Sequence, residues 1–145
     1  MRRIMIAGTN SGCGKTTVTC AVLQVLVNRK INVSSFKCGP DYIDPMFHKT
    51  VIGTAAYNLD TYLMSNDAVN YLLNKNSGDI AVIEGVMGFY DGFSFTEKGS
   101  THELSEITDT DVILVVNCRG MSLSAMALVK GFKAVSYTHL RAHET

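Results

Sequence analysis

The feature that most constrains this chain is the glycine-rich stretch Gly8–Thr17, which reads GTNSGCGKTT. It follows a short apolar run, Arg3–Ala7, which is expected to form a buried strand. It precedes a segment, from Gly14 to about Asn28, whose apolar residues recur at three- and four-residue steps and therefore predict a helix. A strand, a glycine turn and a helix in this order bring backbone N–H groups and a positive helix terminus to one point. The chain is thus expected to fold around a phosphate-binding loop.

Strand-like and helix-like segments continue to alternate after this loop. The stretch 80–86 is nearly all apolar, which is typical of a strand buried on both faces of a parallel sheet. Alternation of this kind implies right-handed crossovers and an α/β fold with a doubly wound, mostly parallel sheet of the P-loop NTPase type, here truncated. The other expected strands are 31–36 and 111–117, and the other expected helices are 67–74 (begun by Ser65 or Asn66), 102–107 and 122–132.

The length and net charge of the chain limit the kinds of partner that it is expected to bind. A chain of 145 residues is one domain's worth, and its formal net charge of zero gives no electrostatic reason to expect nucleic acid as a partner. The longest apolar stretches are too short to span a membrane, and the polar Thr9–Thr17 interrupts what would be a secretion signal, so a cytoplasmic protein is expected. The four cysteines show no CxxC spacing, which favours free thiols.

The last residues, 135–145, read VSYTHLRAHET and match, codon by codon, the translation of a transposon adapter used for sequencing libraries. We therefore expect this tail to be non-native, and we expect residues 1–134 to be an incomplete synthetase domain whose natural continuation is longer. The alternative is a genuine helix end or an exposed tail.

Within the glycine-rich loop, Lys15 is expected to reach the β- and γ-phosphates of a nucleotide and Thr16 to ligate Mg²⁺. A glycine-rich turn with a solvated lysine is the alternative. Five residues separate Gly8 from Gly14-Lys15-Thr16, where the usual pattern has four, and this longer loop resembles the dethiobiotin-synthetase and cobyrinate-amidase branch of P-loop enzymes. The residues expected to contact ATP are Thr9, Asn10, Ser11, Gly12, Cys13, Gly14, Lys15, Thr16 and Thr17.

An acidic loop follows the second strand at the edge of the sheet that also carries the phosphate loop. Lys37 lies at this edge, and Asp41 and Asp44 follow it between two prolines that restrict the backbone. Two carboxylates beside a triphosphate would repel it unless a cation such as Mg²⁺ lay between them. A solvated acidic turn is the alternative.

A third carboxylate, Glu84, lies near the end of the apolar stretch 80–86. Burying it is costly without a partner, and at this edge the metal is the natural one, so Glu84 occupies a Walker-B-like position. Gly85 and Gly88 allow the backbone to approach the γ-phosphate closely, and Asp91 lies in the glycine-flanked turn that follows. A plain turn-forming role is the alternative for Asp91.

Taken together, these segments resemble cobyrinate a,c-diamide synthases. Dethiobiotin synthetases share the phosphate loop but lack the acidic segment, and cobyric acid synthases diverge there. The matching segments span most of residues 1–133: Gly8–Thr17, Lys37–His48, Asn58–Thr61, Val82–Gly88 with Tyr90–Gly92, and Val115–Met121.

The resemblance implies a bifunctional, glutamine-using carbon–nitrogen ligase of cobalamin biosynthesis. One domain would use ATP and Mg²⁺ to phosphorylate the a and c carboxylates of a corrinoid substrate. A glutaminase domain of the same parent chain, absent here, would supply ammonia. The implied roles are metal binding for Thr16, Asp44 and Glu84, phosphate binding for Lys15 and Lys37, substrate carboxylate chemistry for Asp41 and Asp91, and base recognition for Asn117.

Several alternatives stay open at this point. A related synthase acts on a nickel tetrapyrrole and shares these motifs. A P-loop ATPase acting as an assembly or partition switch is disfavoured, because Asn10 stands where such proteins carry a signature lysine. For Tyr42, Tyr62 and Met87, core packing competes with corrin contact, and for His48 a structural hydrogen bond competes with a family role. The parent protein as a homodimer is a further open alternative. No membrane partner is expected, and the fragment itself is expected to be inactive.

Overall fold

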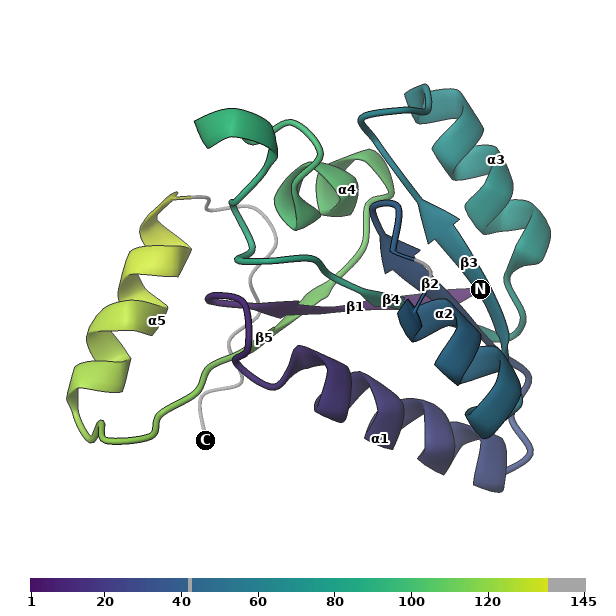
Figure 1. Cartoon of the computed structure of the whole chain (residues 1–145), viewed down its shortest axis with the longest axis horizontal. Helices are drawn as coiled ribbons and strands as arrows, with labels where there is room; N and C mark the ends of the chain where they lie inside the picture. Colours follow the sequence, from purple (N-terminus) through teal and green to yellow (C-terminus); the bar gives the residue numbers. More distant parts are fainter. Residues whose placement is uncertain (42, 136–145) are drawn as a thin grey trace.

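A computed structural model describes residues 1–41 and 43–135, and its centre is a parallel sheet (Figure 1). The five strands lie in the order β3-β2-β4-β1-β5, and every paired neighbour runs parallel. Their bounds are β1 Arg2–Gly8, β2 Val33–Cys38, β3 Ala55–Leu59, β4 Ile80–Glu84 and β5 Val112–Val115. The predicted α/β fold with a doubly wound parallel sheet is therefore confirmed.

Helices connect the strands, and α3 and α4 each begin at a capping serine. In α3, the Ser65 side chain accepts a hydrogen bond from the Ala68 N–H at 3.2 Å, and in α4 Ser100 caps the Glu103 N–H at 3.0 Å. The described helices are α1 Lys15–Asn28, α2 Ile43–Phe47, α3 Asn66–Asn76, α4 Thr101–Ile107 and α5 Ser124–Val135, with a π-helical turn η1 His48–Ile52 and a 3₁₀ turn η2 Phe93–Phe95.

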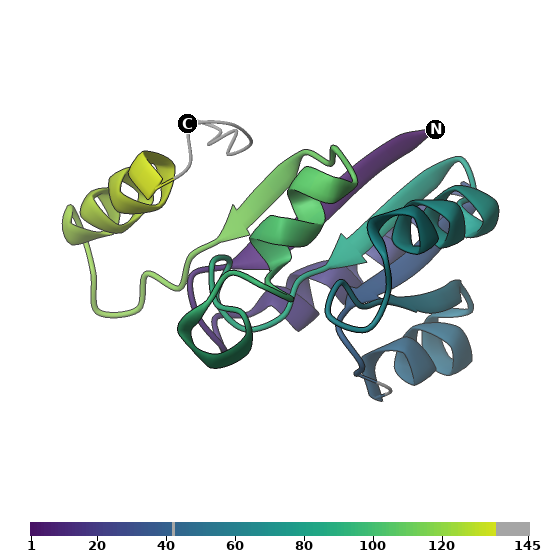
Figure 2. The same cartoon turned by 90° about the horizontal axis from the view of Figure 1, so that it is seen from above.

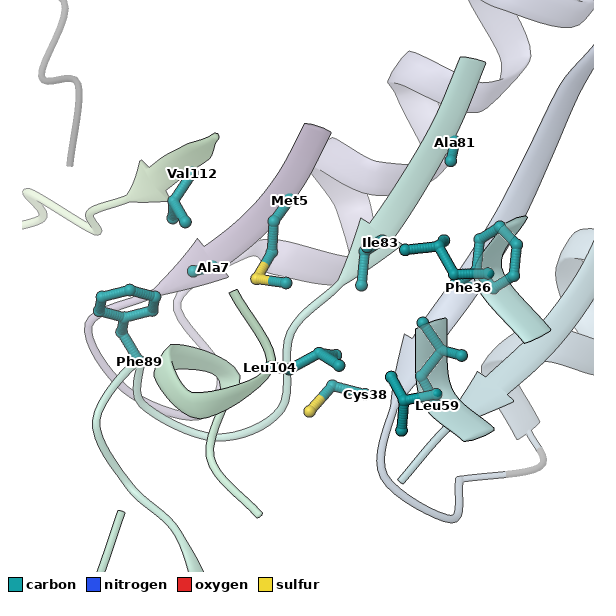
Figure 3. Packing of buried hydrophobic residues seen from close by; sticks show 12 residues of the cluster. Met5, Ala7, Phe36, Cys38, Leu59, Ala81, Ile83, Phe89, Leu104 and Val112 are labelled. Carbon is teal, nitrogen blue, oxygen red and sulfur yellow. The ribbon is translucent and has the colours of Figure 1, made fainter. Parts of the chain in front are cut away.

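The three central strands, β2, β4 and β1, bury both of their faces, because alternate side chains enter two separate cores. From β1, Met5 and Ala7 point into the larger core with α3 and α4, whereas Ile6 points into the smaller core with Leu23 of α1. Figure 1 shows α1 on one side of the sheet and α3 and α4 on the other. Figure 3 shows side chains of all five strands and Leu104 of α4 meeting in the larger core.

Two segments differ from the sequence prediction. Residues 55–59, with two alanines and an asparagine, lack a clear strand pattern, and they form β3 because β2 offers them a free edge to pair with. The loop expected through about Asp44 ends slightly earlier, because α2 begins at Ile43 and η1 follows it, and Pro45 is tolerated because it lies in the first turn of α2. The predicted strands 80–86 and 111–117 also extend too far, since β4 ends at Glu84 and β5 at Val115.

The helix α5 stands apart from the rest of the fold, beyond the edge strand β5 (Figures 1 and 2). None of its residues is buried, and its main anchor is Phe132, whose carbonyl accepts a hydrogen bond from the Tyr90 hydroxyl at 2.6 Å. An open apolar groove of about 420 Å³ runs along this contact. Among the residues that the structure describes, no helix has the length and apolar character to cross a bilayer. Most of the predicted foreign tail, 136–145, lies outside the described residues, and so does Tyr42.

Candidate functional site

The phosphate loop links the end of β1 to the start of α1. Gly14 precedes the helix with φ 105°, a left-handed conformation that only glycine adopts without strain. The first N–H groups of α1 lack a capping side chain, and they are therefore available to an anion. The loop thus has the backbone of a phosphate site, as its sequence predicts.

Lys15 lies folded back over this loop. Its side chain is only 8% exposed, and its Nζ donates to the Asn10 carbonyl at 3.3 Å. A Cβ on Gly8 would come within 2.8 Å of the Lys15 side chain, so glycine at this position makes room for the lysine stem. The ammonium is thereby held above the loop, where an incoming phosphate would replace the carbonyl as its partner.

The acidic loop and the end of β4 meet around Lys37. Its Nζ lies 3.1 Å from Asp44 Oδ2, 3.2 Å from Glu84 Oε1 and 4.0 Å from Asp41 Oδ2. It also donates to the Gly85 carbonyl at 3.1 Å. Lys37 is therefore the counter-ion of the carboxylate cluster, and the contact with phosphate that the resemblance implies for it stays a prediction.

Glu84 connects this cluster to the phosphate loop. The Thr16 hydroxyl donates to Glu84 Oε1 at 2.7 Å, and the Glu84 side chain is fully buried. The three residues predicted to hold a metal, Thr16, Asp44 and Glu84, are thus brought together, because the parallel β2 and β4 end at the same edge of the sheet.

Burial and charge shift the pKa values of two groups around Glu84 in opposite directions. Burial alone would lower the pKa of Lys37, but the charge of Glu84 and the hydrogen bond with Asp44 outweigh it, so the pKa is raised and the ammonium stays charged. For His48, burial dominates and lowers the pKa, despite the opposing effect of the Glu84 charge. The imidazole therefore stays neutral near pH 7.

The donor set suits Mg²⁺. A hydroxyl and two carboxylates are hard oxygen ligands, and the buried Glu84 Oε2 has no hydrogen-bond partner. Within residues 1–41 and 43–135, no group of three or more His, Cys, Asp or Glu side chains is placed to hold a metal ion. Mg²⁺ at this point would therefore take its remaining ligands from phosphate and water, which is its usual behaviour beside nucleotides. Metal binding by Thr16, Asp44 and Glu84 stays a prediction.

The other predicted residues are spread along the same edge. Asp41 is partly exposed and caps α2 by accepting from the Ile43 N–H at 2.9 Å. Asp91 is exposed and lies against Gly88, where any Cβ would collide with its carboxylate. Asn117 follows β5 and accepts from the Arg119 N–H at 2.9 Å. Contact of Asp41 and Asp91 with substrate, and of Asn117 with the base, stays a prediction.

Two residues for which core packing and corrin contact were the alternatives, Tyr62 and Met87, are exposed. Tyr62 is 49% and Met87 42% exposed, so neither is a core residue. Tyr62 stacks on Phe93 with ring centroids 5.0 Å apart.

The motif around Asn58 supports the acidic loop rather than joining the site. Asn58 Nδ2 donates to the Gly39 carbonyl at 2.8 Å and to the Asp41 carbonyl at 2.5 Å. Thr61 donates to Glu103 Oε2 at 2.8 Å and so ties the end of β3 to α4. The loop that carries Asp41 is therefore fixed from the neighbouring strand.

Sequence reasoning named His48, for which a structural hydrogen bond was one alternative, but it missed the buried Ser35 that His48 contacts behind Glu84. Ser35 Oγ lies 2.6 Å from His48 Nδ1, and His48 Nε2 lies 3.8 Å from Glu84 Oε2. A signal was present, because a serine in a strand that is buried at all six positions needs a hydrogen-bond partner.

The parallel sheet, the loop between β1 and α1, and the carboxylate at the end of β4 together define a P-loop nucleotide-binding protein. The comparison with protein families agrees. Residues 4–140 match the CbiA family model, described as the CobQ/CobB/MinD/ParA nucleotide binding domain, and the chain belongs to that family.

Relatives with curated names carry the comparison further. The chain is 50% identical over 136 residues to a cobyrinate a,c-diamide synthase of Thermoplasma volcanium and 47% identical over 135 residues to that of Priestia megaterium. These matches cover 92% and 91% of this chain but only 30% and 29% of the relatives. The resemblance inferred from the motifs is confirmed, and the chain spans about a third of the length of the relatives it matches.

Solved structures with a similar fold include two signal recognition particle receptors of the FtsY type. The chloroplast FtsY of Physcomitrella patens and the FtsY of Elizabethkingia anophelis each superpose with a TM-score of 0.62 at 15% identity. Each superposition covers 93% of this chain, and the two cover 46% and 47% of the respective FtsY chains. At this identity the likeness concerns the fold alone.

Proposed function

We propose that the protein containing this domain amidates the a and c carboxylates of cobyrinate in cobalamin biosynthesis, with ATP as the energy source and glutamine or ammonia as the nitrogen source. The names of relatives 42–50% identical to the chain, all cobyrinate a,c-diamide synthases, support this substrate. The observation that carries the chemistry is the contact between Thr16 of the phosphate loop and the buried Glu84, with Lys37 balancing the carboxylates.

The proposed reaction has two steps at each carboxylate. The substrate carboxylate oxygen attacks the γ-phosphorus of ATP, the bond from that phosphorus to the β-phosphate oxygen breaks, and ADP leaves. Ammonia then attacks the acyl carbon, the carbon–oxygen bond to phosphate breaks, and an amide, phosphate and a proton are released. A carboxylate is a poor electrophile towards ammonia, and conversion to an acyl phosphate, a mixed anhydride, provides the leaving group that it lacks.

The residues of this chain would contribute alignment and charge. Lys15 and the N–H groups at the start of α1 bind the phosphates. Thr16, Asp44 and Glu84 would hold Mg²⁺, which neutralises charge on the transferring phosphoryl group. Asp41 and Asp91 face the same edge of the sheet, and we propose that they contact the substrate side of the reaction, while Asn117 contacts the base.

Nitrogen supply is proposed to come from a glutaminase domain of the parent chain, in a cytoplasmic enzyme. None of the four cysteines lies in a nucleophile elbow of the Gly-x-Cys-x-Gly type. We therefore assign no glutamine hydrolysis to the residues of this chain.

Phosphate release from ATP tests the proposal. A protein extended to the length of its relatives should release phosphate only when cobyrinate and either ammonia or glutamine are both present. Lys15→Ala and Glu84→Gln should each lower turnover by about a hundredfold or more, the scale expected when a charge partner of the transition state is lost. Unchanged turnover in both variants would refute the site, and turnover with a nickel tetrapyrrole in place of cobyrinate would transfer the proposal to the related synthase.

A further inference from the structure

A chain of three buried polar side chains lies behind the proposed metal site. Ser35 of β2, His48 at the start of η1 and Glu84 at the end of β4 are 1%, 0% and 0% exposed. Ser35 Oγ lies 2.6 Å from His48 Nδ1, and the other ring nitrogen, Nε2, faces Glu84 Oε2 at 3.8 Å. We refer to these three as the Ser35–His48–Glu84 chain.

Hydrogen-bond chemistry fixes the proton on the histidine ring. A glutamate carboxylate only accepts hydrogen bonds, so the ring nitrogen that faces it must carry the proton. Neutral imidazole carries a proton on one nitrogen alone, and Nδ1 must then accept from the Ser35 hydroxyl. Glu84 thus favours the tautomer whose Nε2–H is directed at it, and the Ser35 hydroxyl can donate to the Nδ1 that this tautomer leaves as an acceptor.

The pair is close but not in contact. His48 Nε2 and Glu84 Oε2 are both buried without a hydrogen-bond partner, and 3.8 Å is longer than a hydrogen bond allows. Both groups would gain a hydrogen bond if the imidazole and the carboxylate moved closer together by about 1 Å. The other carboxylate oxygen, Oε1, is meanwhile held by Thr16 and Lys37.

We propose that His48 is a positioning residue for Glu84: its Nε2–H, oriented by Ser35, binds Oε2 and so directs Oε1 towards Thr16 and the divalent cation. This inference rests on the proposed nucleotide and metal site. Partners of this kind, one shell behind a ligand, fix its orientation and raise its affinity for metal. A purely space-filling role would need no polar atom at either ring nitrogen.

The tautomer is tested first, because it needs no ligand. Long-range ¹⁵N–¹H correlation spectra of the histidine rings in the full chain should show His48 as the neutral Nε2–H tautomer. Glu84→Gln should shift the His48 Nε2 resonance, and Ser35→Ala should shift the Nδ1 resonance, because Nδ1 then loses its hydrogen-bond donor. An Nδ1–H tautomer in the unmodified chain, or an Nε2 resonance that Glu84→Gln leaves in place, would overturn the proposal.

Metal affinity is tested second, with Mn²⁺ as the probe in the presence of ATP and electron paramagnetic resonance as the readout. His48→Phe, which fills the volume but cannot donate, should weaken Mn²⁺ binding by about 10- to 100-fold. His48→Gln should recover most of the affinity, because its amide nitrogen can replace Nε2. The control is His102→Gln, since His102 is also buried but its ring faces Glu97 and Glu106 instead of Glu84.

The outcomes separate the two proposals. Equal Mn²⁺ affinity in the folded His48→Phe variant and the unmodified chain would overturn the positioning role, even if that variant is less stable. If the unmodified chain binds no Mn²⁺ with ATP, the proposed nucleotide site fails. The spectra then decide the contact between His48 and Glu84 by themselves.

Discussion

Removing the positive charge of Lys37 should destabilise the fold strongly, because it leaves a buried carboxylate without its counter-ion. In Lys37→Met the side chain keeps its length, but Glu84, which is fully buried, loses an ammonium at 3.2 Å. At an effective dielectric constant of 20, a pair at this distance interacts by about 5 kcal/mol. Breaking a buried pair by removing one partner typically costs about 3–5 kcal/mol.

We therefore expect the free energy of unfolding to fall by about 3–5 kcal/mol in Lys37→Met. Asp44 adds less to this loss, since its side chain is 20% exposed and water can replace part of the interaction. The measurement is urea unfolding followed by far-ultraviolet circular dichroism at pH 7, with a chelator present so that no divalent cation takes the place of the ammonium.

Two further variants make the result decisive. Lys49→Met removes an exposed lysine and should change the free energy of unfolding by less than about 0.5 kcal/mol. The double variant Lys37→Met/Glu84→Gln should be more stable than Lys37→Met alone, because no buried charge then remains unpaired. A loss below about 1 kcal/mol in Lys37→Met, or a double variant less stable than the single one, would refute this reasoning.

Three other predictions concern the loop after β4, the last helix and the thiols. Gly88→Ala should weaken ATP binding, measured by calorimetry, by about tenfold or more, because the added Cβ would lie 2.9 Å from the backbone carbonyl of Thr9 and displace the phosphate loop; unchanged affinity would contradict this. Phe132→Ala should speed amide hydrogen exchange throughout α5 and leave the sheet protected, because it removes the Phe132 ring from its packing against Tyr90, with ring centroids 5.6 Å apart, and α5 has no buried residue to replace that contact. Iodoacetamide at pH 8 should label the exposed Cys118 in the native chain and Cys38 only after unfolding, because burial raises the pKa of the Cys38 thiol to about 12; early labelling of Cys38 in a peptide map would show that the core is open.

The parts of the fold that could be predicted from the sequence are those with strong local patterns. The apolar run before Gly8 and the three- to four-residue spacing after Gly14 identify β1 and α1, and the nearly uninterrupted apolar residues identify β4. By contrast, β3 has little strand pattern of its own and depends on pairing with β2, which no local signal reveals.

The candidate site divides in the same way. Thr16, Asp44 and Glu84 could be placed together, because each follows a predicted strand end or starts a predicted helix at one edge of a parallel sheet. The partner of Lys37 could not be assigned, since a lysine at that edge can reach either a phosphate or a carboxylate. The choice depends on side-chain distances that only the folded structure provides.

The position of β1 inside the sheet has a consequence for the order in which the molecule assembles. Arg2 pairs with Ile80 of β4 and Met5 with Val112 of β5, so β1 cannot complete its pairing until these two later strands have been synthesised. Contacts between such distant parts of a chain form slowly, because a long loop must close before they contribute any stability. During synthesis, β2 and β3 can pair much earlier, whereas the nucleotide loop gains its final shape only when most of the domain has left the ribosome.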